Sequence, residues 1–269
     1  MHHSLYQIIF NYKQNKKLAD IAVLIKPAHH KHAINHPESW DDLPMGEWLA
    51  NQVQARLDEW CPQIFGYHLL KLGGLSGELN CFGSSIRHQV TATTEQGLGG
   101  VYTDPCHLPF QENCIDACIL TQAIDFSADP HQVLREIERV LTGDGYLILS
   151  GYNPLSLCGA VKMLGFKRNV PPWSARMFTP ARIKDWLELL GFEIVQDDRF
   201  GFTTFLGKKP LTWWSESVGQ MHFPSFSSVY FIVARKRRVP ISPVKSWWQL
   251  SRSKRPLIVT SATRKLPND

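Results

Sequence analysis

Residues 67–77 read YHLLKLGGLSG, an apolar run followed directly by a turn of glycine, leucine and serine. The apolar run predicts a buried strand over residues 67–72, and the glycines predict a turn at its C-terminal end. In a parallel sheet ligands bind where the strands end, and the small residues Gly73, Ser76 and Gly77 would let a ligand approach the backbone. The turn matches neither the dinucleotide fingerprint GxGxxG nor a P-loop, which needs a following Gly-Lys-Ser/Thr.

Helices and further strands alternate along the rest of the chain. Apolar residues at a spacing of 3.6 between Trp48 and Trp60 predict an amphipathic helix that ends at Pro62. Two more helices are expected to begin at Asp129-Pro130 and at Thr179-Pro180, because proline is tolerated in a first helical turn. Further strands are expected at residues 86–92, 100–103, 115–121, 145–150, 192–195 and 229–234. This alternation predicts a doubly wound, mostly parallel α/β sheet of seven strands with helices on both faces.

Charge divides the chain of 269 residues unevenly. Residues 235–269 hold ten Lys and Arg and one acid, a charge of +9, whereas residues 1–234 carry −4 and the whole chain only +5. With 43% hydrophobic and 20% charged residues, the length suits one α/β domain with appendages. We therefore predict a flexible leader over residues 1–40, a folded domain over residues 41–235, and a flexible basic tail over residues 236–269.

Signals for a membrane span, export or a bound metal are missing from the sequence. No apolar run reaches the roughly 18 residues needed to span a bilayer, and the N-terminus lacks the features of a signal peptide. The six cysteines form no CxxC pair, so we expect all of them to be reduced, without structural zinc, in a cytoplasmic protein. His32 and His36 have helical spacing, but no carboxylate or cysteine accompanies them, and no metal site is predicted.

A series of motifs follows the turn in a specific order. Residues 103–110 read TDPCHLPF, residues 113–118 read NCIDAC, residues 134–141 read LREIERVL, and residues 145–149 read GYLIL. Together with the turn, this series resembles the class I S-adenosylmethionine-dependent methyltransferases, most closely the type 11 methyltransferase domain family, over roughly residues 60–235. The resemblance implies a Rossmann-like fold whose last strand is antiparallel, S-adenosyl-L-methionine as the cofactor, and methyl transfer as the reaction.

The resemblance also implies roles for single residues. Asp104, which precedes Pro105, would accept a hydrogen bond from the adenine amino group, and Glu95 is a candidate to hold the ribose hydroxyls. Thr121 and Gln122 would lie beside the cofactor and face the acceptor pocket. Four small residues of the turn would line the methionine and ribose parts of the cofactor: Gly73, Gly74, Ser76 and Gly77. No catalytic residue is assigned, because methyl transfer needs a general base only when the acceptor must lose a proton.

Three positions differ from the family's pattern and keep a second hypothesis open. Lys71 stands where the family usually has an acid that attracts the cofactor's ammonium, and Leu75 replaces the middle glycine of the turn. Pro105 has no N–H to offer the adenine ring. The chain is therefore either a methyltransferase acting on a small molecule or an RNA, or a methyltransferase-like binding protein with a degenerate cofactor site.

The basic tail suggests a partner of its own. Trp247-Trp248 lies between clusters of Lys and Arg, a combination suited to phosphate contact and base stacking, so nucleic acid is a candidate partner for residues 236–269. An anionic membrane surface is a weaker candidate. A solvated tail without a partner is the simpler alternative.

Overall fold

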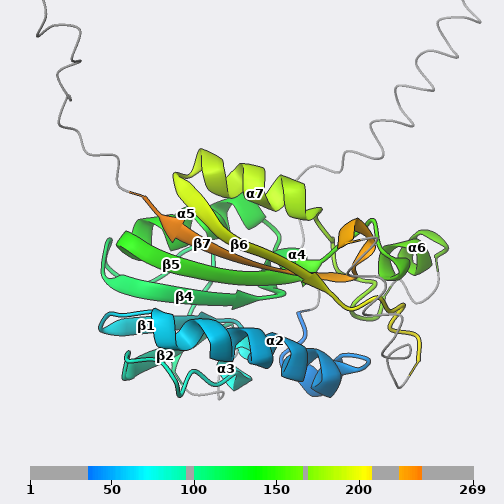
Figure 1. The fold of residues 1–269 in the computed structure, drawn as a ribbon, viewed down its shortest axis with the longest axis horizontal. Coiled ribbons are helices and arrows are strands. Elements are labelled where there is room, and N and C mark those ends of the chain that lie inside the picture. Colours follow the sequence, from blue (N-terminus) through cyan, green and yellow to red (C-terminus); the bar gives the residue numbers. More distant parts are fainter. Residues whose placement is uncertain (1–35, 95–99, 166–168, 208–223, 238–269) are drawn as a thin grey trace, which may run out of the picture. The chain divides into compact units, whose positions relative to one another are not determined.

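The computed structural model describes residues 36–94, 100–165, 169–207 and 224–237 (Figure 1). Its centre is a seven-stranded sheet with the order β3-β2-β1-β4-β5-β7-β6. Five parallel strands form one side of the sheet: β1 (His68–Leu72), β2 (His88–Thr93), β3 (Val101–Tyr102), β4 (Ile115–Thr121) and β5 (Leu141–Tyr152). β7 (Val229–Lys236) runs antiparallel to both of its neighbours, β5 and β6 (Phe192–Phe200). The predicted fold class is confirmed, including the antiparallel last strand.

Helices cover both faces of the sheet, and the alternation of side chains along each strand supplies both cores. In β1, Leu69 points to the face covered by α2 (Gly46–Trp60), whereas Leu70 and Leu72 point to the opposite face. That opposite face is covered by α4 (Ala123–Phe126), α5 (Pro130–Val140) and α7 (Pro180–Leu189) (Figure 1). The short elements are α3 (Gly74–Glu78), α6 (Leu157–Met163), η1 (Trp40–Asp42), η2 (Cys61–Gln63) and η3 (Pro224–Phe226).

The two proline-headed helices begin where the sequence predicts. The side chain of Asp129 accepts a hydrogen bond from the Gln132 amide at the start of α5, and the side chain of Thr179 accepts one from the Arg182 amide at the start of α7. α5 ends at Val140, and β5 follows at once, six residues longer than predicted. The first part of the extension contains an irregularity: Ile115 pairs with Leu141 and Ala117 pairs with Tyr146, so β5 has three more residues than β4 between these two pairs.

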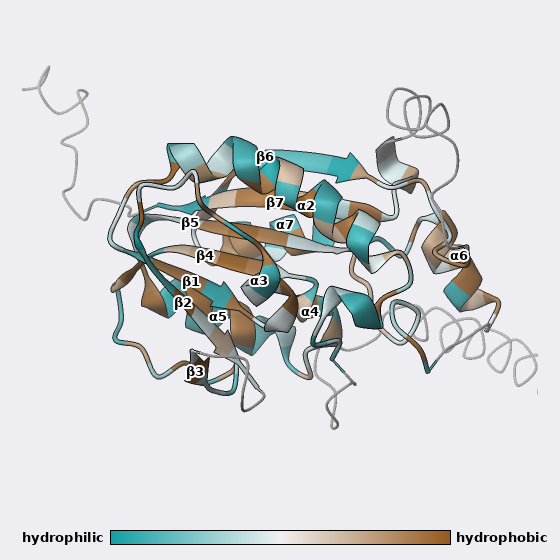
Figure 2. Ribbon diagram, turned by 90° about the horizontal axis from the view of Figure 1, so that it is seen from below, coloured by the Kyte–Doolittle hydropathy of each residue, from teal (hydrophilic) through white to brown (hydrophobic). Residues whose placement is uncertain are grey.

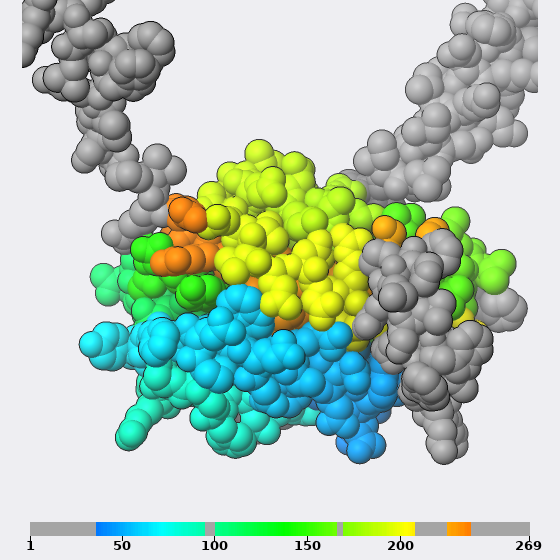
Figure 3. Space-filling model, in the orientation of Figure 1, coloured from blue at the N-terminus to red at the C-terminus, as the bar shows by residue number. Residues whose placement is uncertain are grey.

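β6 is also longer than its apolar stretch at residues 192–195 indicates. Its second half is polar because it is an edge strand, and Figure 2 shows it as mostly hydrophilic. Asp198 pairs with Arg56 of α2, and Asp197 pairs with Lys184 of α7. Figure 3 shows the side chains of α2 and β6 in contact on one surface. These polar contacts hold a strand that hydrophobic alternation could not reveal.

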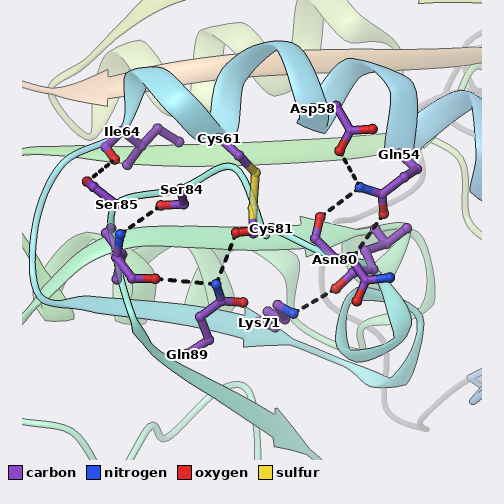
Figure 4. The surroundings of a disulfide bond; sticks show 12 residues. Gln54, Asp58, Cys61, Ile64, Lys71, Asn80, Cys81, Ser84, Ser85 and Gln89 are labelled. Atoms are coloured by element: carbon purple, nitrogen blue, oxygen red, sulfur yellow. Dashed lines mark hydrogen bonds between the residues drawn. A yellow bond between two sulfur atoms is a disulfide. The ribbon is translucent and has the colours of Figure 1, made fainter.

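Cys61, which follows α2, and Cys81, which follows α3, form a disulfide (Figure 4). Their Cα atoms lie 5.7 Å apart although 20 positions separate them in sequence. The expectation that all six cysteines are reduced is therefore wrong for this pair. No local motif marks the pair, because α2 and the segment after α3 meet only in the folded chain.

The folded unit ends at Arg237, slightly beyond the predicted boundary. Lys236 is almost fully buried, pairs with Glu138, and donates a hydrogen bond to the Leu141 carbonyl oxygen at 2.9 Å. Arg235 pairs with Asp144, and Arg237 pairs with Glu193. Three of the ten basic residues counted toward the tail are thus bound to acids of the domain. Residues 1–35 and 238–269, including Trp247-Trp248, lie outside the described residues.

None of the helices in the described residues has the length and apolar character needed to cross a membrane.

Residues 36–40, which the sequence assigned to the leader, are part of the folded structure.

Candidate functional site

The strand order reverses between β1 and β4, the position where open α/β sheets bind ligands. The structure brings the predicted residues at these two strand ends together. The Thr121 amide donates a hydrogen bond to Ser76 Oγ at 2.8 Å. A Cβ atom placed on Gly73 would lie 3.7 Å from Ala123 Cβ. The glycine-rich turn after β1 therefore contacts the end of β4 directly.

The glycines of the turn are required for different reasons. Gly73 has φ +90°, a conformation that side-chain-bearing residues rarely adopt. A Cβ on Gly74 would lie 2.1 Å from the Glu38 carbonyl oxygen, and one on Gly77 would lie 2.8 Å from Thr91 Cγ2. Gly74 and Gly77 are thus needed for close packing within the chain itself, whatever they contribute to a ligand.

A segment that we name the strap, residues 36–40, crosses the turn. Trp40 anchors it: the buried indole donates a hydrogen bond to the Leu75 carbonyl oxygen at 3.0 Å. The His36 ring lies 3.6 Å from the Cβ position of Gly73 and stacks at a tilt on Phe126, with 5.6 Å between ring centroids. The strap has no local sequence signal, because Trp40 and His36 contact Leu75 and Gly73, which are distant in sequence.

Lys71 and Leu75, which differ from the family's pattern, direct their side chains away from Gly73. The Lys71 ammonium donates a hydrogen bond to the Leu79 carbonyl oxygen at 2.7 Å, at the far end of α3 from Gly73 (Figure 4). Burial lowers the pKa of Lys71. The Leu75 side chain is fully buried in the core beneath α2. Neither side chain is placed to repel a ligand at Gly73.

Asp104 and Pro105 lie in the loop after β3, two strands from β1. Asp104 accepts hydrogen bonds from the Cys106 amide at 2.9 Å and from His107 Nδ1 at 3.1 Å. Partial burial acts to raise the pKa of Asp104, but these hydrogen bonds outweigh it, and the pKa lies below its ordinary value. The carboxylate is therefore ionised and exposed, so it can accept a hydrogen bond from a ligand N–H. Glu95 lies outside the described residues.

Buried polar groups gather just beyond the ends of β4 and β5. Gln122 has φ +56°, and neither atom of its buried side-chain amide has a hydrogen-bond partner. Asp125 in α4 is fully buried; its Oδ2 accepts a hydrogen bond from the Tyr152 amide at 2.7 Å. Asp125 Oδ1 and the hydroxyls of Tyr152 and Tyr230 have no partner. Burial raises the pKa of Asp125 to about 7, although the Tyr152 amide and the charge of Lys162 lower it.

Asp125 is a functional candidate that the sequence analysis did not identify. In the sequence, Asp125 is one acid shortly after the apolar strand at residues 115–121. Acids are common at such positions, so its presence does not indicate a functional site. Its burial and its neighbours, which single it out, exist only in the folded chain.

The residues present can accommodate the cofactor that the resemblance implies. Gly73 has no side chain, and the nearest atoms to its Cβ position belong to the His36 ring and to Ala123 at 3.6 and 3.7 Å, so a ligand would reach the backbone beside the His36 ring. The orphaned amide of Gln122 offers both a donor and an acceptor at the neighbouring strand end. Asp104 adds an ionised acceptor beyond β3. Among the described residues, no group of three or more metal-ligating side chains occurs.

Comparison with known proteins agrees with this geometry. Residues 70–149 match the methyltransferase domain family. The chain is 37% identical to YafS, an uncharacterized protein of Escherichia coli (strain K12), over 221 residues that cover 81% of this chain and 88% of the relative. The chain belongs to the class I S-adenosylmethionine-dependent methyltransferase family.

Solved structures of this methyltransferase fold extend the comparison. A SAM dependent methyltransferase from Archaeoglobus fulgidus has a TM-score of 0.51 and 21% identity, covering 70% of this chain and 94% of that one. The [4+2]-cyclase SpnF has a TM-score of 0.50 and 17% identity, covering 78% and 87%. At these identities the two structures support the fold alone, and membership of the methyltransferase family leaves the acceptor open.

Proposed function

We propose that the protein binds S-adenosyl-L-methionine across the carboxyl ends of β1 and β4 and transfers its methyl group to a small-molecule acceptor. One observation carries the proposal: the Gly73 turn is joined to the end of β4 by the Ser76–Thr121 hydrogen bond, next to the unpartnered amide of Gln122. The switch point of the sheet thus has both the backbone shape and the free polar groups that a polar ligand requires.

Each part of the site has a distinct task. The cofactor supplies a methyl group on a positively charged sulfur. Gly73 and Ser76 would hold its methionine and ribose parts, and Asp104 would accept a hydrogen bond from its adenine amino group. Gln122 would orient the reacting end. Orientation of the reactants and exclusion of water can lower the barrier by roughly 7–11 kcal/mol, so the site's main work is positioning.

Charge favours a small molecule over RNA at this site. Residues 1–234 carry a net charge of −4, and the basic residues at the end of β7 are already paired with acids. Binding of nucleic acid depends on unpaired basic groups near the phosphates. The polar groups beyond β4 and β5 are also deeply buried, which suits a compact acceptor.

Calorimetry with S-adenosylhomocysteine tests the cofactor assignment. We expect saturable binding by the native chain, and about tenfold weaker binding by Asp104→Ala, because a hydrogen bond to a charged group is lost. Asp144→Ala is the matched control. Asp144 is also an exposed, ion-paired carboxylate, but it lies in the N-terminal part of β5 beside Arg235, away from the strand ends that form the site. No binding by the native chain would contradict the proposal.

A second candidate, a methyltransferase-like binding protein that has lost its cofactor, is favoured by the strap. The His36 ring and the Glu38 carbonyl already contact the turn where the cofactor would lie. On this candidate the native chain would not bind S-adenosylhomocysteine, and His36→Gly would create or greatly strengthen binding. Equal binding by the native chain and His36→Gly would exclude it.

A further inference from the structure

Two of the buried polar groups, Asp125 and Tyr230, form a cluster at Gly151. A Cβ atom on Gly151 would lie 2.3 Å from the Tyr230 hydroxyl and 3.0 Å from Asp125 Oδ2. A glycine at this position is therefore what lets the carboxylate and the phenol approach the same point of β5. The cluster adjoins the proposed cofactor site, because the Asp125 amide donates to the Gln122 carbonyl oxygen at 3.2 Å and Ala123 contacts the Gly73 turn.

Two polar atoms of this cluster lack a hydrogen-bond partner. Asp125 and Tyr230 are both fully buried, yet Asp125 Oδ1 and the Tyr230 hydroxyl have no hydrogen-bond partner. Leaving such groups unpaired is costly, and they usually mark a position that a ligand or water fills. Oδ2 accepts a hydrogen bond from the Tyr152 amide, and the Phe178 amide also lowers the pKa of the carboxyl, so the carboxylate is fixed by backbone groups.

We propose that this cluster is the acceptor subsite, that it takes an acceptor with a phenolic or enolic hydroxyl, and that Asp125 is the catalytic base that removes the hydroxyl proton. The inference rests on the proposed function. It adds the substrate class and the residue that handles the proton, and it assigns Tyr230 to hold the acceptor oxygen by a hydrogen bond.

The step balances without another reactant. The acceptor O–H bond breaks and its proton passes to Asp125 Oδ1. The oxygen lone pair forms the new O–CH3 bond, while the S–CH3 bond breaks and its electron pair stays on sulfur. The sulfonium becomes a neutral thioether, the acceptor becomes a methyl ether, and Asp125 later releases the proton to water.

The surroundings of Asp125 favour an acidic hydroxyl as the acceptor. Its pKa, raised by burial to about 7, makes it a stronger base than an ordinary carboxylate, but still too weak for an alkyl alcohol. A phenol, with an ordinary pKa near 10, is within reach of such a base. Five titratable or charged groups act on Asp125 from the neighbouring elements: Tyr152, Cys158, Lys162, Arg176 and Tyr230.

Methyl transfer from labelled cofactor to 4-methylphenol tests the base, with 4-methylbenzyl alcohol as the alkyl comparison. We expect transfer to the phenol only, with kcat rising between pH 5.5 and 7.5. Asp125→Asn should lower kcat at least about 100-fold and bind S-adenosylhomocysteine as the native chain does, since the amide oxygen can still accept from Tyr152. Tyr230→Phe should raise KM more than it lowers kcat.

Asp116→Asn is the matched control. Asp116 also accepts hydrogen bonds from backbone amides, those of Tyr67 at 2.7 Å and His68 at 3.0 Å. It lies near the N-terminal end of β4, away from the strand ends that form the site. Its kcat should equal that of the native chain. This control separates loss of a base from general damage by an Asp→Asn change.

A binding measurement does not depend on turnover. With S-adenosylhomocysteine bound, the native chain should bind 4-methylphenol more tightly than Tyr230→Phe does, because Tyr230 holds the acceptor oxygen by a hydrogen bond. The inference is overturned if Asp125→Asn keeps its kcat, if 4-methylphenol binds equally well to the native chain and to Tyr230→Phe, or if the native chain binds S-adenosylhomocysteine but methylates no phenol. Failure to bind S-adenosylhomocysteine at all would instead overturn the proposed function.

Discussion

Asp125 shows how the environment of one residue alters its chemistry. An aspartate in water is ionised well below neutral pH, but complete burial raises the pKa of Asp125 to about 7. At pH 5 the folded chain therefore keeps a proton on this carboxyl that the unfolded chain has lost. The same property that suits a base near neutrality also makes stability depend on pH.

The sign of that dependence follows from proton binding. Between about pH 4 and pH 7 the folded state binds more protons at Asp125 than the unfolded state does, so the free energy of unfolding falls as the pH rises, and it levels off above pH 7. The full effect is at most about 4 kcal/mol. Urea unfolding at pH 5 and pH 8 measures it, and Asp125→Asn should remove most of the difference. An unchanged difference in the variant would contradict the raised pKa.

The contribution of Glu136 to the free energy of unfolding depends on pH in the opposite direction, and it changes at lower pH values. Hydrogen bonds and charge from Arg139 hold the pKa of Glu136 below its ordinary value. Its contribution to stability is present above the unfolded pKa and is lost on acidification. Because this contribution is common to the native chain and the variant, comparing the two isolates Asp125.

Among the elements, the first strand and its turn are held by more than hydrophobic burial. The disulfide from Cys61 to Cys81 closes a loop that contains β1, the turn and α3. Near it, Gln54 of α2 bonds to both the amide and the carbonyl of Asn80 (Figure 4). α2 is therefore tied to the segment that follows the candidate site.

We expect reduction of this disulfide to lower the free energy of unfolding by about 3 kcal/mol, as predicted for closure of a loop of this length. Urea unfolding with and without reductant measures the loss. The double variant Cys61→Ser/Cys81→Ser should match the reduced chain and should not respond to reductant. Titration of the denatured, unreduced chain should find four thiols, and six would contradict the bond.

For the whole molecule, the position where the domain ends can be tested by truncation. A chain ending at Arg237 should keep the stability and the S-adenosylhomocysteine affinity of the full chain. A chain ending at Arg235 should lose about 1–3 kcal/mol, because the buried pairing of Lys236 with Glu138 and with the Leu141 carbonyl is removed. Equal stability of the two truncated chains would contradict this boundary.

The basic tail remains a separate prediction at this scale. Retention of RNA by the full chain, weakening with salt and absent from the chain ending at Arg237, would support a nucleic-acid partner for residues 238–269. Equal retention by both chains would contradict it. The cytoplasmic location also stays a prediction.

Most elements could be predicted because their signals are local. The strand before Gly73, the Pro130 and Pro180 helix starts and the apolar face of α2 depend on neighbours within a few positions, and the structure confirms them. The polar half of β6 could not be predicted this way, because an edge strand held by Arg56 and Lys184 has no hydrophobic alternation.

The fold class, the position of the glycine turn and the family resemblance could be predicted from the chain alone, because strand and helix periodicity and motif order are local patterns. Which residues meet at the site depends on how distant segments pack together. This packing placed His36 over Gly73, turned Lys71 toward Leu79, joined Cys61 to Cys81, and buried Asp125 beside Tyr230. The physical reason is that these contacts join residues far apart in sequence, and both burial and pKa are properties of the assembled surroundings.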